Sequence, residues 1–164
     1  MKKVGLIFVS ISALLLGACG NSTASEDGKL NIVTTFYPVY EFTKQVAGDE
    51  ANVDLLVKAG TEVHDYEPSA KDIARIQEAD VFVYENENME TWVHDVEESI
   101  DTSKVSVIRA TEGMLLLLGS EEGEDYDHSE EGHSHAYDPH VWLSPARAIT
   151  LVETIRDSLV AKYP

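Results

Sequence analysis

Basic residues and cysteine are scarce in this chain. It has 12 lysines and arginines against 30 aspartates and glutamates, so the formal net charge is −18. Such an acidic surface attracts cations and repels the phosphate backbone of a nucleic acid, which excludes nucleic-acid binding. Cys19 is the only cysteine, so the chain forms no disulfide within itself. The remaining composition, with 43% hydrophobic residues in 164, is that of one ordinary globular domain.

The motifs of nucleotide-binding and nucleophilic enzymes are missing as well. The chain contains no G-x-G-x-x-G, P-loop or G-x-S-x-G pattern, and it lacks the H-E-x-x-H spacing of zinc proteases. A zinc hydrolase would also need a carboxylate base, for which Glu62, Asp65 and Glu67 beside His64 are the candidates. We therefore expect a binding protein and no enzyme, with a zinc hydrolase and a surface adhesin as the alternatives.

No hydrophobic run is long enough to cross a bilayer. The run from Val4 to Leu16 has 13 almost wholly apolar residues, whereas a membrane-spanning helix needs roughly 20. It follows two lysines and precedes small residues, which is the layout of a secretory signal. The run Leu16-Gly17-Ala18-Cys19 has the form of a bacterial lipobox. We therefore predict a signal peptide over 1–18, a lipid on Cys19 that anchors an extracytoplasmic protein to the cell membrane, and a flexible tether over 19–29.

Residues 30–164 alternate between strand-like and helix-like segments. Short β-branched runs predict strands, and apolar residues three or four apart between them predict helices. This alternation predicts an α/β fold with a mainly parallel sheet flanked by helices. Ligands of such sheets bind in the loops beyond the carboxyl ends of the strands. The predicted strands are Leu30–Thr35, Val53–Val57, Val81–Tyr84 and Val105–Ile108.

Two of the predicted helices carry start signals. Ser69, with Asp72 three residues later, has the pattern of a capping box. Ser144 followed by Pro145 predicts a helix that begins with serine as its N-cap. The apolar face predicted for this last helix consists of Ile149, Val152, Ile155 and Leu159.

One segment interrupts the alternation. Seven of the eleven residues from Glu121 to Glu131 are acidic, and His128, His133 and His135 lie in or just after them. A segment with so few apolar residues cannot offset the entropy lost on ordering, so we predict a mobile insertion over 119–137. Imidazole and carboxylate groups both bind zinc, which makes the three histidines candidate accessory metal ligands. The alternative is that this segment is only a run of charged residues exposed to solvent and binds no metal.

The other three histidines differ in their surroundings. His64 lies in the loop before the capped helix, and His140 lies just before the last helix. Both positions are at the ligand end of the predicted sheet, and Asp138 is placed to orient the His140 ring. The two histidines are 76 positions apart in the sequence, so they can meet only through the fold. The alternative is that each is a hydrogen-bonded structural residue and not a metal ligand. His94, on a helix predicted over Met89–Ile100, is expected at the surface.

Five segments occur in an order that resembles a known family. They are the lipobox, the run from Thr34 to Tyr40, the loop from Gly60 to Ser69, the histidine-rich insertion and the run from Asp138 to Pro145. Together they resemble the metal-binding lipoproteins of ABC-type zinc and manganese uptake systems. In that family the histidine of each of the two loops is a metal ligand in a cleft between two α/β lobes. The resemblance therefore implies that His64 and His140 are metal ligands.

The resemblance also implies a function and a partner. Family members capture a metal outside the cytoplasm and deliver it to an ABC permease with its ATPase. They continue into a second lobe with a third histidine and an acidic ligand. The resemblance thus implies that this chain is the amino-terminal lobe of a two-lobed metal-binding solute-binding protein, with the second lobe absent. Many members have proline where this chain has Val63.

Zinc is the metal that the donors favour. Imidazole prefers zinc over manganese, which prefers carboxylate and water, so manganese is the alternative. Zinc usually takes four donors, of which His64 and His140 supply two. Water or the histidines of the insertion would complete the shell, and we expect weaker binding than with four protein ligands. Protons compete for imidazole, so binding should weaken as pH falls.

Overall fold

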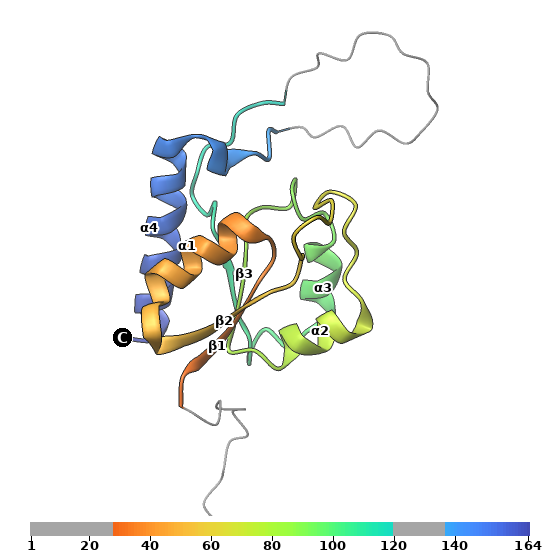
Figure 1. The fold of residues 1–164 in the computed structure, drawn as a ribbon, viewed down its shortest axis with the longest axis vertical. Helices are drawn as coiled ribbons and strands as arrows, with labels where there is room; N and C mark the ends of the chain where they lie inside the picture. Colours follow the sequence, from red (N-terminus) through yellow and green to blue (C-terminus); the bar gives the residue numbers. More distant parts are fainter. Residues whose placement is uncertain (1–27, 120–136) are drawn as a thin grey trace, which may run out of the picture.

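The computed structural model describes residues 28–119 and 137–164. At its centre lie four parallel strands in the order β2-β1-β3-β4 (Figure 1). They are β1 (Leu30–Thr34), β2 (Ala51–Leu55), β3 (Val81–Tyr84) and β4 (Ser106–Arg109). Each begins and ends within two residues of its predicted bounds. The prediction of an α/β fold with a parallel sheet is confirmed.

Helices cover both faces of this sheet. α1 (Tyr37–Ala47) and α4 (Pro145–Lys162) pack together on one face, and α2 (Ala70–Gln77) and α3 (Val93–Ser99) lie on the other (Figure 1). Val81 and Val83 of β3 belong to the core under α1 and α4, whereas Phe82 and Tyr84 belong to the core under α2 and α3. A strand buried on both faces needs a continuous apolar run, which β3 has.

The capping signals are largely confirmed. Ser69 Oγ accepts the Asp72 N–H and the Asp72 carboxylate accepts the Ser69 N–H, so α2 has its capping box. Ser144 occupies the N-cap position of α4, but its side chain makes no capping hydrogen bond to any described residue. Pro145 follows it and has no N–H to be capped. Two short 3₁₀ turns, η1 (Gly48–Glu50) and η2 (Val141–Leu143), complete the described elements.

Two helix predictions need correction. Ile155 and Leu159 of α4 are buried as predicted, but the third buried residue is Leu151. Ile149 is 60% exposed, because it lies two residues from Leu151 and therefore on the opposite side of the helix. The helix predicted over Met89–Ile100 begins only at Val93, after a separate turn in which the Met89 and Glu90 N–H groups bond to the Asn86 carbonyl.

The carboxyl ends of all four strands lie at one end of the molecule. β1 leads into α1 on one face and β3 leads into α3 on the other, so the space between β1 and β3 is a topological switch point, where such sheets bind ligands. The predicted signal peptide, Cys19 and nearly all of the tether and of the insertion lie outside the described residues. Among the described helices, none is long and apolar enough to cross a membrane.

Candidate metal centre

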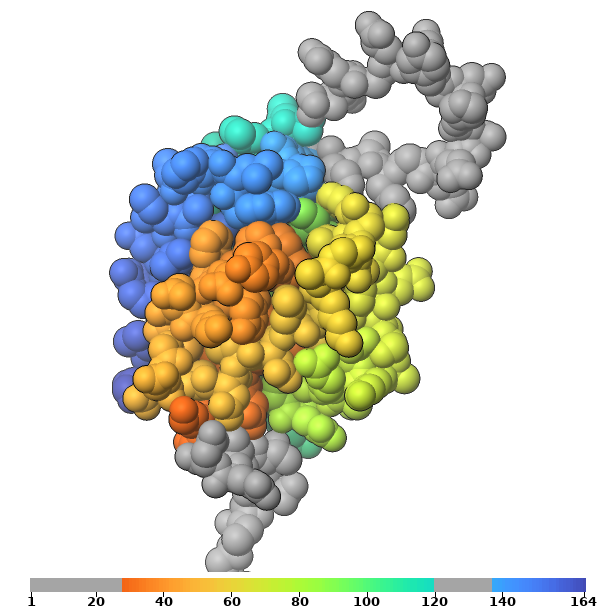
Figure 2. Space-filling model, viewed as in Figure 1, coloured from red at the N-terminus to blue at the C-terminus, as the bar shows by residue number. Residues whose placement is uncertain are grey.

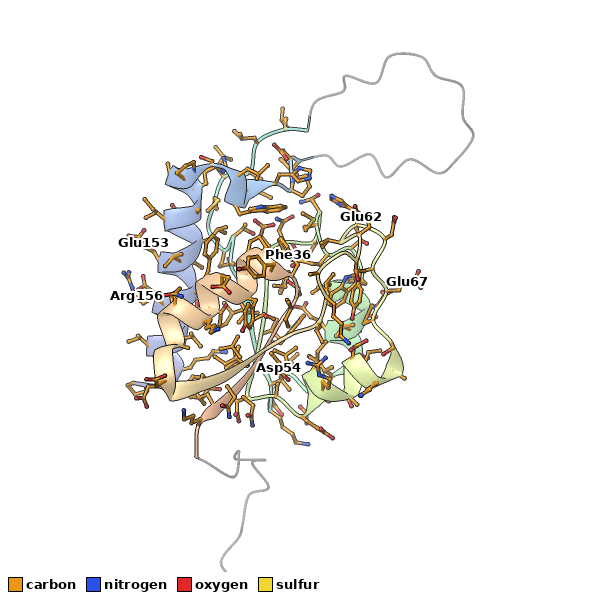
Figure 3. All side chains as sticks on the ribbon, viewed as in Figure 1. Phe36, Asp54, Glu62, Glu67, Glu153 and Arg156 are labelled. Carbon is orange, nitrogen blue, oxygen red and sulfur yellow. The ribbon has the colours of Figure 1, made fainter. Side chains whose placement is uncertain are left out.

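The loop between β2 and α2 carries His64, and its neighbours fix it. Tyr66 packs edge-on against Trp92 with 5.7 Å between ring centroids, and its hydroxyl interacts with the Asp72 carboxylate of the capping box. Burial and the Asp72 carboxylate raise the pKa of Tyr66 to about 12, so the hydroxyl remains a donor. The His64 N–H donates to Glu62 Oε1 at 3.3 Å, and Figure 3 shows Glu62 at the outer edge of this loop.

The segment before α4 carries His140, and Asp138 orients its ring. An antiparallel bridge between Leu118 and Tyr137, with a 2.9 Å hydrogen bond from the Asp138 N–H to the Leu117 carbonyl, holds this segment. Asp138 Oδ1 lies 2.9 Å from both the backbone nitrogen and Nδ1 of His140. The backbone hydrogen bond and then the ring hydrogen bond hold the pKa of Asp138 below its ordinary value. A carboxylate only accepts, so Nδ1 donates and Nε2 keeps its lone pair for a metal.

The fold brings the two predicted ligands together. His64 Nε2 and His140 Nε2 are 3.5 Å apart, with ring centroids 5.5 Å apart and ring planes at 66°. Two nitrogens bound to one tetrahedral zinc ion lie about 3.3 to 3.4 Å from each other. The spacing of the pair therefore suits zinc. In Figure 2 the yellow segment after β2 and the blue segment before α4 come together at the same end of the molecule.

Aromatic rings support the His140 side of the pair. The Trp142 ring centroid lies 5.4 Å from that of His140 and 4.9 Å from that of Phe36. Phe36 is 3% exposed and comes directly before α1, so it is fixed by the core. The side chain of His140 itself is 44% exposed. The His140 ring is therefore supported by Trp142, while part of its side chain remains open to solvent.

Each histidine of the pair lines a surface hollow of its own. A cavity of about 660 Å³ opens on the His64 side and one of about 270 Å³ on the His140 side. The first is lined by residues that include His64, Tyr66, Trp92 and Asp95, and the second by residues that include His140, Leu117, Leu143 and Arg147. Solvent or further donors can therefore reach an ion at the pair from either side.

Two buried glutamates at this end of the sheet were missed by the sequence analysis. Glu90 accepts hydrogen bonds from Thr35 Oγ1 at 2.6 Å, from the Glu85 N–H at 2.9 Å and from the Asn86 N–H at 3.0 Å. It thus joins the loop after β1 to the loop after β3. Burial raises the pKa of Glu90 to about 7, against the opposing effect of these bonds. Glu85 is also fully buried, and its place directly after an apolar strand was the signal that could have identified it.

The remaining candidate ligands lie elsewhere. The His94 side chain is 72% exposed beside Glu98 on α3, as predicted. The accessory candidates His128, His133 and His135 lie outside the described residues. Within residues 28–119 and 137–164, no group of three or more histidine, cysteine, aspartate or glutamate side chains could hold a metal. The described part of the chain therefore offers the imidazole pair and no larger cluster.

Comparison with known proteins gives consistent results. The chain is 67% identical over 165 residues to the zinc-binding lipoprotein AdcA of Streptococcus pneumoniae, covering all of this chain and 33% of the relative. It is 49% identical over 169 residues to the high-affinity zinc uptake system protein ZnuA of Bacillus subtilis, covering 99% of this chain and 53% of the relative. The crystal structure of Zn(II)-bound AdcA from S. pneumoniae matches with a TM-score of 0.72 and 65% identity, over 84% of this chain and 27% of that one.

The chain thus spans from about a third to about half of the length of these relatives. The resemblance expected from the two histidine loops is confirmed. The family model described as zinc-uptake complex component A, periplasmic, matches residues 32–164, and the chain therefore belongs to the ZnuA family.

Proposed function

We propose that this chain captures zinc at the His64–His140 pair and is the metal-binding lobe of an extracytoplasmic lipoprotein that delivers zinc to an ABC permease with its ATPase. The observation that carries this proposal is the 3.5 Å distance between the two Nε2 atoms at the switch point of the sheet. The names of the AdcA and ZnuA relatives and the zinc in the AdcA crystal structure support it.

Zinc fits the pair better than manganese. Both donors are imidazole nitrogens, and the nearby Asp138 carboxylate is bonded to His140. Manganese prefers carboxylate and water oxygens, whereas neutral imidazole suits zinc. The proposed role is capture and delivery without a covalent step, and the open front of the pair is suited to release as well as to binding.

The rest of the chain supports this role. We propose that residues 1–18 direct export, that a lipid on Cys19 with the tether over 19–29 keeps the lobe near its permease, and that residues 30–164 form the lobe. Two imidazoles leave a tetrahedral zinc ion with two open positions. Water, or His128, His133 and His135 of the insertion over 119–137, would complete the shell.

The test is a titration of the full chain with zinc in competition with a chelator. We expect the tightest site to disappear when His64→Ala and His140→Ala are combined. His94→Ala, which removes an exposed histidine on α3, is the matched control and should bind as the wild type does. Deletion of 121–135 should weaken binding less than the double substitution. If the double variant binds zinc as tightly as wild type and only the deletion matters, the pair is not the site.

A further inference from the structure

Glu85 occupies the centre of the ligand end of the sheet. It directly follows β3, one of the two strands that flank the switch point. Its carbonyl accepts hydrogen bonds from Thr111 Oγ1 at 2.8 Å and from the Thr111 N–H at 3.2 Å, so its backbone is fixed by the loop after β4. The residue is 0% exposed. Its side chain therefore has no direct access to solvent.

The Glu85 carboxyl group lacks the partners that an ionised group needs. No described residue makes a hydrogen bond to either of its oxygens. The backbone N–H of Trp142 favours the ionised form of Glu85, but it does not form a hydrogen bond with the carboxyl group. A buried carboxylate without donors carries a large desolvation cost, and such a group usually stays protonated instead. The geometry alone thus favours an uncharged acid at this position.

The charges around Glu85 point the same way. Glu90 in the same loop accepts three hydrogen bonds, which favour its ionised form. The negative charge of ionised Glu90 opposes a negative charge on Glu85. Asp138, before α4, also opposes ionisation, while Arg147 on α4 favours it. Burial first, and then the charge of Glu90, raise the pKa of Glu85 to about 9.

A cation at the histidine pair would reverse this balance. Asp138 is hydrogen-bonded to His140, and its single negative charge already acts on Glu85. A zinc ion held by His140 brings two positive charges to the other side of the same ring. Bound cations are often the largest local charges in a site and lower the pKa of nearby acids.

We propose that Glu85 is uncharged in the empty lobe and loses its proton to solvent when zinc binds to His64 and His140, so that capture of the cation releases a proton from a buried acid. The inference rests on the proposed function, because it needs zinc at that pair. Glu85 acts here through its charge and not as a ligand, since no cluster of three ligating groups forms among the described residues. The new carboxylate offsets part of the charge of the ion.

The first test counts protons. Zinc chloride is added to the full chain at about pH 8 in weakly buffered solution with an indicator dye, where free imidazole is already neutral. We expect the wild type to release about one proton more per bound zinc than Glu85→Gln, because glutamine has the shape of the neutral acid and no proton to give. Glu153→Gln makes the same chemical change at an exposed position on the outer side of α4 (Figure 3) and should release as many protons as wild type.

A second measurement observes the carboxyl group directly. The infrared difference spectrum between zinc-free and zinc-bound wild type should show the loss of a carboxylic-acid band and the gain of a carboxylate band. The acid band should be absent from zinc-free Glu85→Gln. If Glu85→Gln binds zinc and releases as many protons as wild type, or if no acid band is lost, the inference is wrong. Binding that survives loss of both histidines would instead overturn the proposed function.

Discussion

The orientation of the His140 ring depends on one carboxylate. Asp138 bonds to both the backbone and Nδ1 of His140 and so leaves Nε2 directed at His64. We expect Asp138→Ala to lower zinc affinity about 10- to 100-fold, as loss of the partner of a ligating histidine usually does. Chelator competition measures this. Asp157→Ala removes an exposed carboxylate on α4 and should leave the affinity unchanged. Equal affinities in the two variants would show that Asp138 does not orient the ligand.

Glu90 joins the loop after β1 to the loop after β3 through three hydrogen bonds. Glu90→Ala would leave the Thr35 hydroxyl and the N–H groups of Glu85 and Asn86 buried without their acceptor. We expect the free energy of unfolding to fall by about 3 kcal/mol or more, since each orphaned buried group costs about 1–3 kcal/mol. Urea unfolding measures this, and the exposed Glu153→Ala is the control. A loss no larger than that of the control would mean that water replaces the carboxylate.

At the residue scale, the local sequence indicates where the two histidines lie in the fold, and their role as metal ligands stays a prediction. His64 and His140 stand in loops with recognisable neighbours, and the position of each before a helix places it at the ligand end of the sheet. Their 3.5 Å separation depends on how far the two loops bend, which no local pattern gives. Glu85 and Glu90 were missed because glutamate is normally a surface residue. Only the packing of two loops over them makes these carboxyl groups buried.

At the scale of elements, α4 offers a direct comparison of two isoleucines. Ile155 is fully buried against the core under α1 and α4, whereas Ile149 is 60% exposed. We expect Ile155→Ala to lower the free energy of unfolding by about 2–5 kcal/mol, because it leaves a cavity. Ile149→Ala should change it by about 0.5 kcal/mol or less. Urea unfolding of both variants gives the two values. A large loss for Ile149→Ala would place this side chain in a contact outside the described residues.

Elements with a continuous or strictly alternating signal were predicted best. β3 is apolar at every position and was located without error. α4 was located by Ser144 and Pro145, but its buried face was misjudged, since Ile149 with Val152 and Leu151 with Ile155 each have the spacing of an apolar stripe. Which stripe is buried is decided by the partner helix α1, and the sequence of α4 does not contain that information.

At the scale of the whole molecule, two sources of pH dependence act together. The net charge of −18 makes the folded chain repel itself, and protonation relieves this repulsion. Glu85 and Glu90 add a buried contribution, because burial raises their pKa values to about 9 and about 7 from an ordinary 4.5. Between the ordinary and the raised values the folded chain holds more protons than the unfolded chain.

The sign of the resulting effect follows from linkage. The free energy of unfolding falls with rising pH wherever the folded state holds more protons, so the zinc-free lobe should lose stability from about pH 5 to about pH 9.

Salt separates the two sources of pH dependence, because it screens exposed charges and leaves a buried carboxyl group almost unscreened. Urea unfolding across this range at high sodium chloride should keep a falling profile in wild type and in Glu153→Gln. Glu85→Gln should show a flatter one, since it has lost the acid whose ionisation is suppressed by burial. If salt removes the pH dependence of wild type altogether, the exposed charges alone account for it and Glu85 has no raised pKa.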